Sequence, residues 1–172
     1  MIPPILTTDR LTLAPQEISD FEDSAAMWSD PLVTRHIGGR TSTPEESWAR
    51  LLRGRGLWAL LGYGYWAVRE TTTGRYVGEV GFGDFRRGLE PSIDGTPEMG
   101  WALATWAQGQ GFASEAVAAA LSWGVGQWDR APVVCIIDPD NAPSLKLAHK
   151  MGFLEVTRPT YRDAPTVLLQ RG

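Results

Sequence analysis

Residues 98–123, EMGWALATWAQGQGFASEAVAAALSW, decide the fold class of this chain. We predict a strand over residues 98–104 and a helix over residues 113–123, because Ala113, Ala116, Val117, Ala120 and Leu121 are spaced to share one helical face. Between them lies Gln108-Gly109-Gln110-Gly111-Phe112. Free amides and the helix dipole favour an anion at a helix start, and glycines let its backbone approach closely. The stretch therefore predicts a phosphate site between a strand and a helix.

This glycine-rich turn does not name its ligand. A P-loop is excluded because no Gly-Lys-Ser/Thr follows, and Gly109, Gly111 and Ala113 do not form the dinucleotide fingerprint. Glycines that only allow a tight turn remain an alternative for this segment taken alone.

The rest of the chain continues the alternation of strands and helices. Thr43-Pro44-Glu45-Glu46 is a strong helix start, and we expect that helix to end near Arg53, before Gly54 and Gly56. Residues 84–97 lack periodicity and are predicted to form a loop. Further strands are expected at residues 10–13, 65–70, 75–82, 133–137, 153–156 and 166–169, and further helices at 19–28 and 141–151. We therefore expect one mixed α/β domain over residues 1–172.

Composition excludes several classes of function. The chain has 172 residues, a net charge of −4 and no Lys/Arg-rich run, which argues against nucleic-acid binding. A single cysteine, Cys135, cannot form an internal disulfide, and two histidines leave no His-rich metal site. No apolar run approaches the ~20 residues needed to cross a bilayer. We expect a soluble, cytoplasmic protein without a metal.

Two motifs resemble one known family. The first is the run from Glu98 to Ala116; the second is Asp138-Pro-Asp-Asn141-Ala-Pro-Ser144 followed by Lys150-Met-Gly152-Phe153. Together they are similar to the pyrophosphate loop and the Asn-x-x-Ser and Lys-x-Gly-Phe motifs of the GNAT N-acetyltransferases. The opening Thr8-Asp9-Arg10-Leu11-Thr12-Leu13 also resembles the first strand of the RimJ/RimL branch.

The resemblance implies an α/β (α+β) fold with a mixed, mostly antiparallel sheet of about seven strands and flanking helices. The sheet would be splayed between its fourth and fifth strands, residues 98–104 and 133–137. Acetyl-CoA would lie in that gap as acetyl donor, with no metal. The implied cofactor-binding residues are Trp101, Ala102, Leu103, Gln108, Gly109, Gln110, Gly111, Phe112, Ala113, Ser114, Asn141 and Ser144.

Acetyl transfer also needs a base for the amine and a proton for the departing thiolate. The resemblance favours Glu98 as the base, with Glu79 as the second choice; Glu98 could instead be a strand-end residue paired with an arginine. Ala148 occupies the position where many relatives carry the tyrosine acid. Ser144 could supply the proton or only cap its helix, and Tyr161 is a further candidate.

His36 and Cys135 are the two further residues that bear on the site. His36 could contact the acceptor or lie solvated in a loop, and Cys135 is expected in the core. The sequence thus predicts an N-acetyltransferase that acts on a protein N-terminus or a small-molecule amine, as a monomer or homodimer. A catalytically silent acyl-CoA-binding domain is the alternative, and a nucleotide- or phosphosugar-binding protein is a third hypothesis that depends only on the glycine loop. The acceptor itself carries no recognisable motif.

Overall fold

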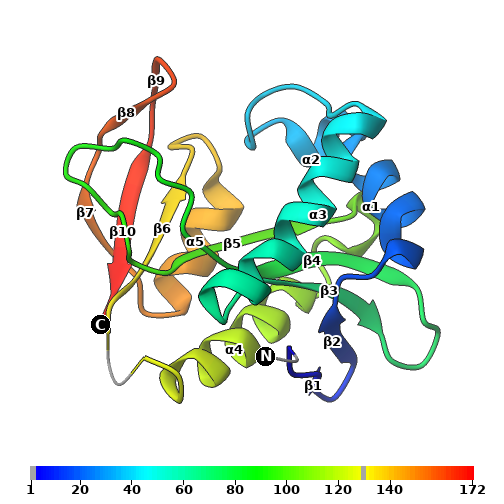
Figure 1. The fold of residues 1–172 in the computed structure, drawn as a ribbon. Coiled ribbons are helices and arrows are strands. Elements are labelled where there is room, and N and C mark those ends of the chain that lie inside the picture. Colours follow the sequence, from blue (N-terminus) through cyan, green and yellow to red (C-terminus); the bar gives the residue numbers. More distant parts are fainter. Residues whose placement is uncertain (1–2, 129–130) are drawn as a thin grey trace.

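A computed structural model describes residues 3–128 and 131–172. Its centre is an eight-stranded sheet in the order β1-β2-β3-β4-β5-β6-β10-β7 (Figure 1). The strands of this sheet are β1 (Leu6–Thr7), β2 (Leu11–Pro15), β3 (Tyr65–Glu70), β4 (Tyr76–Gly83), β5 (Glu98–Leu103), β6 (Val133–Ile137), β7 (Leu154–Thr157) and β10 (Val167–Arg171). The mixed, mostly antiparallel sheet predicted from the sequence is confirmed, with one strand more than expected.

The helices connect the strands and cover both faces of the sheet. They are α1 (Phe21–Trp28), α2 (Pro31–Thr34), α3 (Pro44–Leu61), α4 (Phe112–Val125) and α5 (Ala142–Lys150). Short 3-10 turns, Ile18–Asp20 and Thr105–Ala107, precede α1 and α4. No helix in the described part of the chain is long and apolar enough to span a membrane.

Two cores form on the two faces because side chains alternate along each strand. On one face, α4 and α5 bury a large core that includes Val80, Met99, Cys135, Val167 and Leu169. On the other face, α1 packs Met27 and Trp28 over Ala67 and Ala102. The loop of residues 84–97 covers β6 and β10 on that second face through Leu89 and Ile93.

The sheet opens between β5 and β6. These neighbours are parallel and pair at Glu98 and Val134, whereas β4 and β5 pair over six residues. Beyond Glu98, the rest of β5 diverges from β6, and α5 follows β6 on the far side of the opening (Figure 1). The predicted splay between residues 98–104 and 133–137 is therefore present.

The predicted end of the third helix is wrong. α3 continues through Gly54 and Gly56 to Leu61 and ends at Gly62, which has a left-handed backbone (φ 77°). Gly54 instead allows a close approach, because a Cβ there would lie 2.1 Å from Oε1 of Gln16. The structure also contains a short hairpin that the sequence did not reveal, β8 (Thr160–Tyr161) and β9 (Ala164–Pro165).

Candidate functional site

The glycine-rich turn has the backbone that an anion site needs. Gly109 and Gly111 have φ values of 75° and 81°, in the left-handed region where glycine is favoured, and Gly111 caps the start of α4. A Cβ on Gly109 would meet no atom within 4 Å, so the turn is open to a ligand. Ala113 and Ser114 are half-buried in the first turn of α4. The first turn of α4 therefore follows an accessible, glycine-rich backbone segment.

Residues far away in the sequence hold this turn in place. The Glu115 carboxylate accepts hydrogen bonds from Thr8 Oγ1 (2.6 Å), Arg10 N (2.8 Å) and Arg10 Nε (2.7 Å). Arg10 also donates from Nη1 to the Gln110 carbonyl (2.9 Å). Burial acts to raise the pKa of Glu115, but these hydrogen bonds outweigh it and lower the pKa below its ordinary value. Arg10 thus neutralises the carboxylate nearest the predicted phosphate site, a role that sequence reasoning missed.

Two candidate residues meet across the opening of the sheet. Trp101 on β5 donates from Nε1 to Ser144 Oγ on α5, at 3.3 Å. The Asn141 side chain caps α5 by accepting from Ser144 N (3.2 Å). On the β5 side, Gln108 Nε2 donates to the Leu103 carbonyl (3.1 Å), which ties the turn to the strand end next to Ala102. These contacts connect Trp101 to α5 and the end of β5 to the glycine turn.

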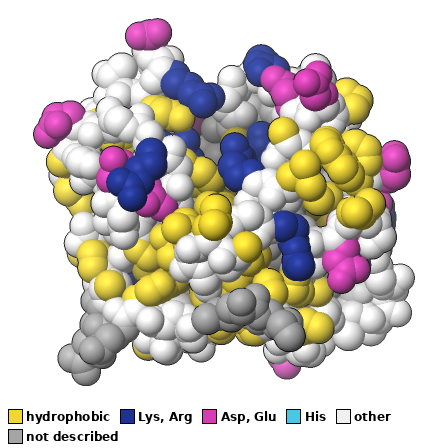
Figure 2. All heavy atoms as spheres, viewed as in Figure 1, with side chains coloured by type: hydrophobic (Ala, Val, Ile, Leu, Met, Phe, Trp, Pro, Cys, Tyr) yellow, Lys and Arg dark blue, Asp and Glu magenta, His cyan; other side chains and the backbone are white. Residues whose placement is uncertain are grey.

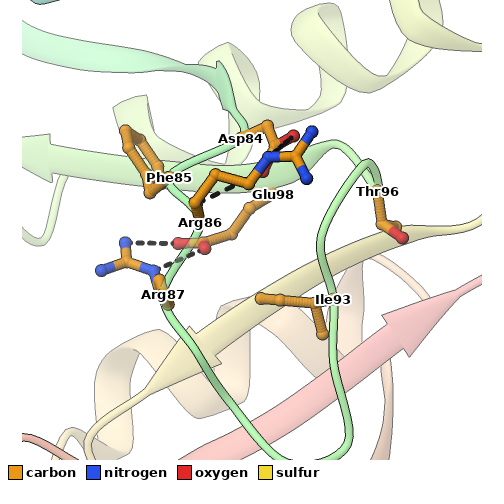
Figure 3. Close-up of a pocket in the computed structure, with 7 residues that line it drawn as sticks. All are labelled: Asp84, Phe85, Arg86, Arg87, Ile93, Thr96 and Glu98. Atoms are coloured by element: carbon orange, nitrogen blue, oxygen red, sulfur yellow. Dashed lines mark hydrogen bonds and ion pairs between the residues drawn. The ribbon is translucent and has the colours of Figure 1, made fainter.

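Glu98 is buried and fully engaged. Its two oxygens accept from Arg87 Nη2 and Nε, both at 2.6 Å, and Arg87 also donates from Nη1 to the Tyr161 hydroxyl (2.9 Å). Arg87 belongs to the loop of residues 84–97, and Figure 3 shows its side chain and that of Glu98 pointing toward one another. Both line a small pocket, together with Phe85 and Ile93 of the same loop. Burial acts to lower the pKa of Arg87, but Glu98 and Tyr161 outweigh it and raise the pKa. The alternative of a pairing with arginine is thus realised, although Glu98 is only 4% exposed.

Glu79 lies on the same face of the sheet and is also buried. Its Oε1 accepts from Ser24 Oγ (2.6 Å) and from the Tyr76 hydroxyl (3.0 Å). Burial first, and then the Glu79 charge, raise the pKa of Tyr76. Burial and the charges of Glu98 and Glu79 likewise raise the pKa of Tyr65. Two carboxylates and two protonated tyrosines therefore form a polar cluster on the face that α1 and α3 cover.

The remaining candidates are His36, Cys135, Ala148 and Tyr161. His36 lies across the opening from β6, with Nδ1 3.3 Å from Oδ2 of Asp138. Cys135 is buried, and burial raises the pKa of its thiol, so it is a core residue. Ala148 is fully buried, and Tyr161 contacts Arg87 rather than Ser144. Among residues 3–128 and 131–172, no group of three or more His, Cys, Asp or Glu side chains could hold a metal ion.

A family model described as an acetyltransferase (GNAT) domain matches residues 10–154. The chain belongs to the GNAT acetyltransferase family. A structure from Bordetella pertussis assigned to GNAT-family acetyltransferases is 35% identical, covers 99% of this chain and 100% of its own, and has a TM-score of 0.88. An uncharacterized N-acetyltransferase, p20, of Bacillus licheniformis is 28% identical over 86% of this chain and 81% of its own.

The fold is also that of a ribosomal-protein acetyltransferase. RimL, an L7/L12 N-terminal acetyltransferase solved with CoA, has a TM-score of 0.76 at 16% identity, and the match covers 98% of this chain and 97% of RimL. The predicted GNAT family and fold are confirmed, and the chain is an acyltransferase of that family.

Proposed function

We propose that this GNAT chain transfers the acetyl group of acetyl-CoA directly to a primary amine, either a protein N-terminus or a small-molecule amine. The observation that carries the proposal is that the glycine turn before α4 follows directly on the open edge of β5. An unpaired strand edge can hydrogen-bond an extended ligand, and the amides of a helix start bind a diphosphate. Acetyl-CoA is extended at one end and carries a diphosphate at the other.

The cofactor would follow the path that the site residues define. The pantetheine arm would lie along Trp101, Ala102 and Leu103, and Asn141 would bind it from the other side of the splay. The diphosphate would lie on the turn of residues 108–114, where the α4 amides supply positive potential and Arg10 neutralises Glu115. Ser144, held against Trp101, would lie beside the sulphur.

The reaction forms one C–N bond and breaks one C–S bond. The neutral amine attacks the thioester carbonyl, a tetrahedral oxyanion forms, and CoA leaves as a thiolate that takes up a proton. We assign that proton to the Ser144 hydroxyl, which takes up a proton from water as it gives its own to the thiolate. We assign the amine proton to Glu98, which lines the pocket at the point where β5 and β6 part. Each of its oxygens accepts one hydrogen bond from Arg87, so the amine proton would go to a remaining lone pair of one of these oxygens.

Binding and transfer can be tested separately. Competition of CoA against ATP separates this proposal from a nucleotide-binding protein, because only CoA offers a pantetheine arm to β5. Thiol release from acetyl-CoA in the presence of an amine panel then separates an enzyme from a silent acyl-CoA-binding domain. The proposal predicts that CoA outcompetes ATP by a wide margin and that thiol release depends on the amine. Tight CoA binding without turnover on a broad panel would favour the silent domain.

A further inference from the structure

Unsatisfied polar atoms gather along the inner face of α3. In the described part of the chain, four buried side-chain atoms lack a hydrogen-bond partner: Gln16 Oε1, Trp28 Nε1, Ser47 Oγ and Arg50 Nε. Ser47 and Arg50 belong to α3, the Arg50 guanidinium stacks on the Trp28 ring at 3.8 Å, and Gln16 abuts Gly54 of α3. Buried polar atoms in folded proteins are nearly always paired, so such a concentration calls for an explanation. Three of the four atoms are hydrogen-bond donors.

Arg50 and Arg53, two of the three arginines on this helix, lie close together and have no anionic partner in the described part of the chain. Arg50 and Arg53 are three residues apart and therefore project from neighbouring positions of α3. Among residues 3–128 and 131–172, no carboxylate lies within ion-pair distance of either guanidinium. Burial lowers the pKa of Arg50, and the Arg53 charge lowers it further, despite the opposite effect of Glu79. Arg50 is half-buried with its Nε buried, and an anion beside the guanidinium would offset the cost of burying that donor without a partner.

Arg53 lies beside a residue of the Glu98 pocket, and Arg50 is one helical turn away on α3. Arg53 is exposed and stacks on Phe85, with its guanidinium 5.3 Å from the ring centre, and Phe85 lines the pocket that contains Glu98. Aromatic rings thus hold both guanidinium groups in place and leave their N–H edges available. Figure 2 shows Lys or Arg side chains within the hollow in the middle of the molecule, between two apolar regions.

The local charge balance is positive. The Tyr65 hydroxyl interacts electrostatically with Glu79, Glu98, Arg53 and Arg87, and Arg50 interacts with Tyr65 and Glu79. Glu46 also acts on Arg50, but it is paired with Arg40; apart from that pair, three guanidinium groups face two carboxylates, which leaves one positive charge in excess. Both carboxylates are already used, Glu98 by Arg87 and Glu79 by two hydroxyl groups. A polyamine would add further positive charge at this place, whereas a single anionic group would balance it.

We infer that Arg50 and Arg53 bind a carboxylate or phosphate group of the acceptor, so that the acceptor is an amine that also carries an anion. The inference extends the proposed function by naming a substrate class. The anionic group would lie between the two guanidinium groups, with the amine toward Glu79 and Glu98. An amino acid or an amino-phosphate compound has this chemistry, and spermidine does not.

The first experiment uses Arg53→Gln, with Arg55→Gln as the matched control. Arg55 is an exposed arginine on the same helix without an ion-pair partner in the described part of the chain. Each protein is assayed with amino acids and their carboxamides as paired acceptors, with phosphoethanolamine and with spermidine. Loss of a charge-assisted hydrogen bond should lower kcat/KM of Arg53→Gln about 10- to 100-fold for anionic acceptors. The carboxamides and the Kd of CoA should be unaffected, and Arg55→Gln should match the wild type. Equal activity of the two variants on anionic acceptors, or a preference of the wild type for spermidine, would overturn the inference.

A second experiment does not depend on turnover. Inorganic phosphate is titrated into wild type, Arg53→Gln and Arg55→Gln at saturating CoA, which occupies the glycine turn, and the thermal midpoint is followed. Wild type and Arg55→Gln should rise with phosphate, and Arg53→Gln should rise less. The same response in all three proteins would mean that water alone satisfies the α3 donors, and the inference would fail. If no amine is acetylated but this phosphate difference appears, the transferase proposal fails while the anion site remains.

Discussion

Breaking the Arg87–Glu98 pair should cost more stability than replacing both partners. The side chains of Glu98 and Arg87 are 6% and 20% exposed, and two hydrogen bonds of 2.6 Å join them. Removing one partner of a buried ion pair typically costs 3–5 kcal/mol, because the other charge stays buried and unpaired. Arg87 is partly exposed and keeps its bond to Tyr161, so we expect Glu98→Leu to cost about 2–4 kcal/mol.

The double variant Arg87→Met with Glu98→Leu removes both charges and fills the space with apolar groups. Such replacements are often neutral, so the unfolding free energy of the double variant should lie within about 1–2 kcal/mol of the wild-type value. Urea unfolding of both single variants and the double variant measures the coupling between the two residues. Glu155→Gln, which breaks an exposed ion pair with Arg158, is the control and should show no measurable change.

The same variants separate two roles of Glu98. If Glu98 is the base, the double variant should be stable and yet at least about 100-fold slower than wild type. Additive single-variant losses in the double variant would refute the buried-pair reasoning. Recovery of activity together with stability would refute the assignment of Glu98 as base and would leave Glu79 as the candidate.

Four further outcomes follow from the contacts described. Glu115→Gln should weaken CoA binding several-fold, measured by calorimetry, but leave binding of acetyl-pantetheine unchanged, since that analogue lacks the diphosphate. Equal losses for the two ligands would contradict the role of the Arg10–Glu115 contacts in holding the glycine turn. Because the pKa of Glu115 is lowered by folding, the carboxylate contributes stability at pH values above its ordinary pKa of 4.5, and this contribution is lost as the pH falls through the lowered pKa. Glu115→Gln should therefore flatten the acid side of a plot of unfolding free energy against pH, and an unchanged plot would contradict this role of Glu115. Ser144→Ala should lower kcat at least about 10-fold with little change in the Kd of CoA, and a change in Kd alone would mean that Ser144 only binds. Gly78→Ala should cost at least about 2 kcal/mol in urea unfolding, because its Cβ would lie 2.1 Å from the Ala102 carbonyl oxygen, whereas Gly56→Ala, with open space in α3, should stabilise by about 0.5–1 kcal/mol; the reverse order would contradict the β4–β5 packing.

The sequence predicted correctly those features that depend on residues close together in the chain. The cap of α5 by Asn141, the start of α3 at Thr43 and the glycine turn before α4 depend on residues a few positions apart, and all three are present. The end of α3 could not be predicted in this way, because Gly54 is explained by Gln16, which lies 38 positions earlier in the chain. A helix can pass through glycine when close packing requires it.

Contacts between distant segments also escaped prediction. Arg10 and Glu115 are separated by 105 positions, and His36 and Asp138 by 102, so no periodicity links them. Arg87 lies in an aperiodic loop, and its engagement of Glu98 depends on how that loop folds back over β6 and β10. The identity of Glu98 could thus be proposed from sequence, but its burial and its two hydrogen bonds could not.

This chain is proposed to transfer an acetyl group directly from acetyl-CoA to an amine. The most direct measurement is mass spectrometry of both the protein and an amine panel after incubation with acetyl-CoA, with free CoA quantified alongside. We predict one added acetyl group on an acceptor and an equal amount of released CoA. The mass of the protein should be unchanged, so that Cys135 in particular carries no acetyl group. Bound CoA without any acetylated amine, or an acetyl group retained on the protein, would contradict the account.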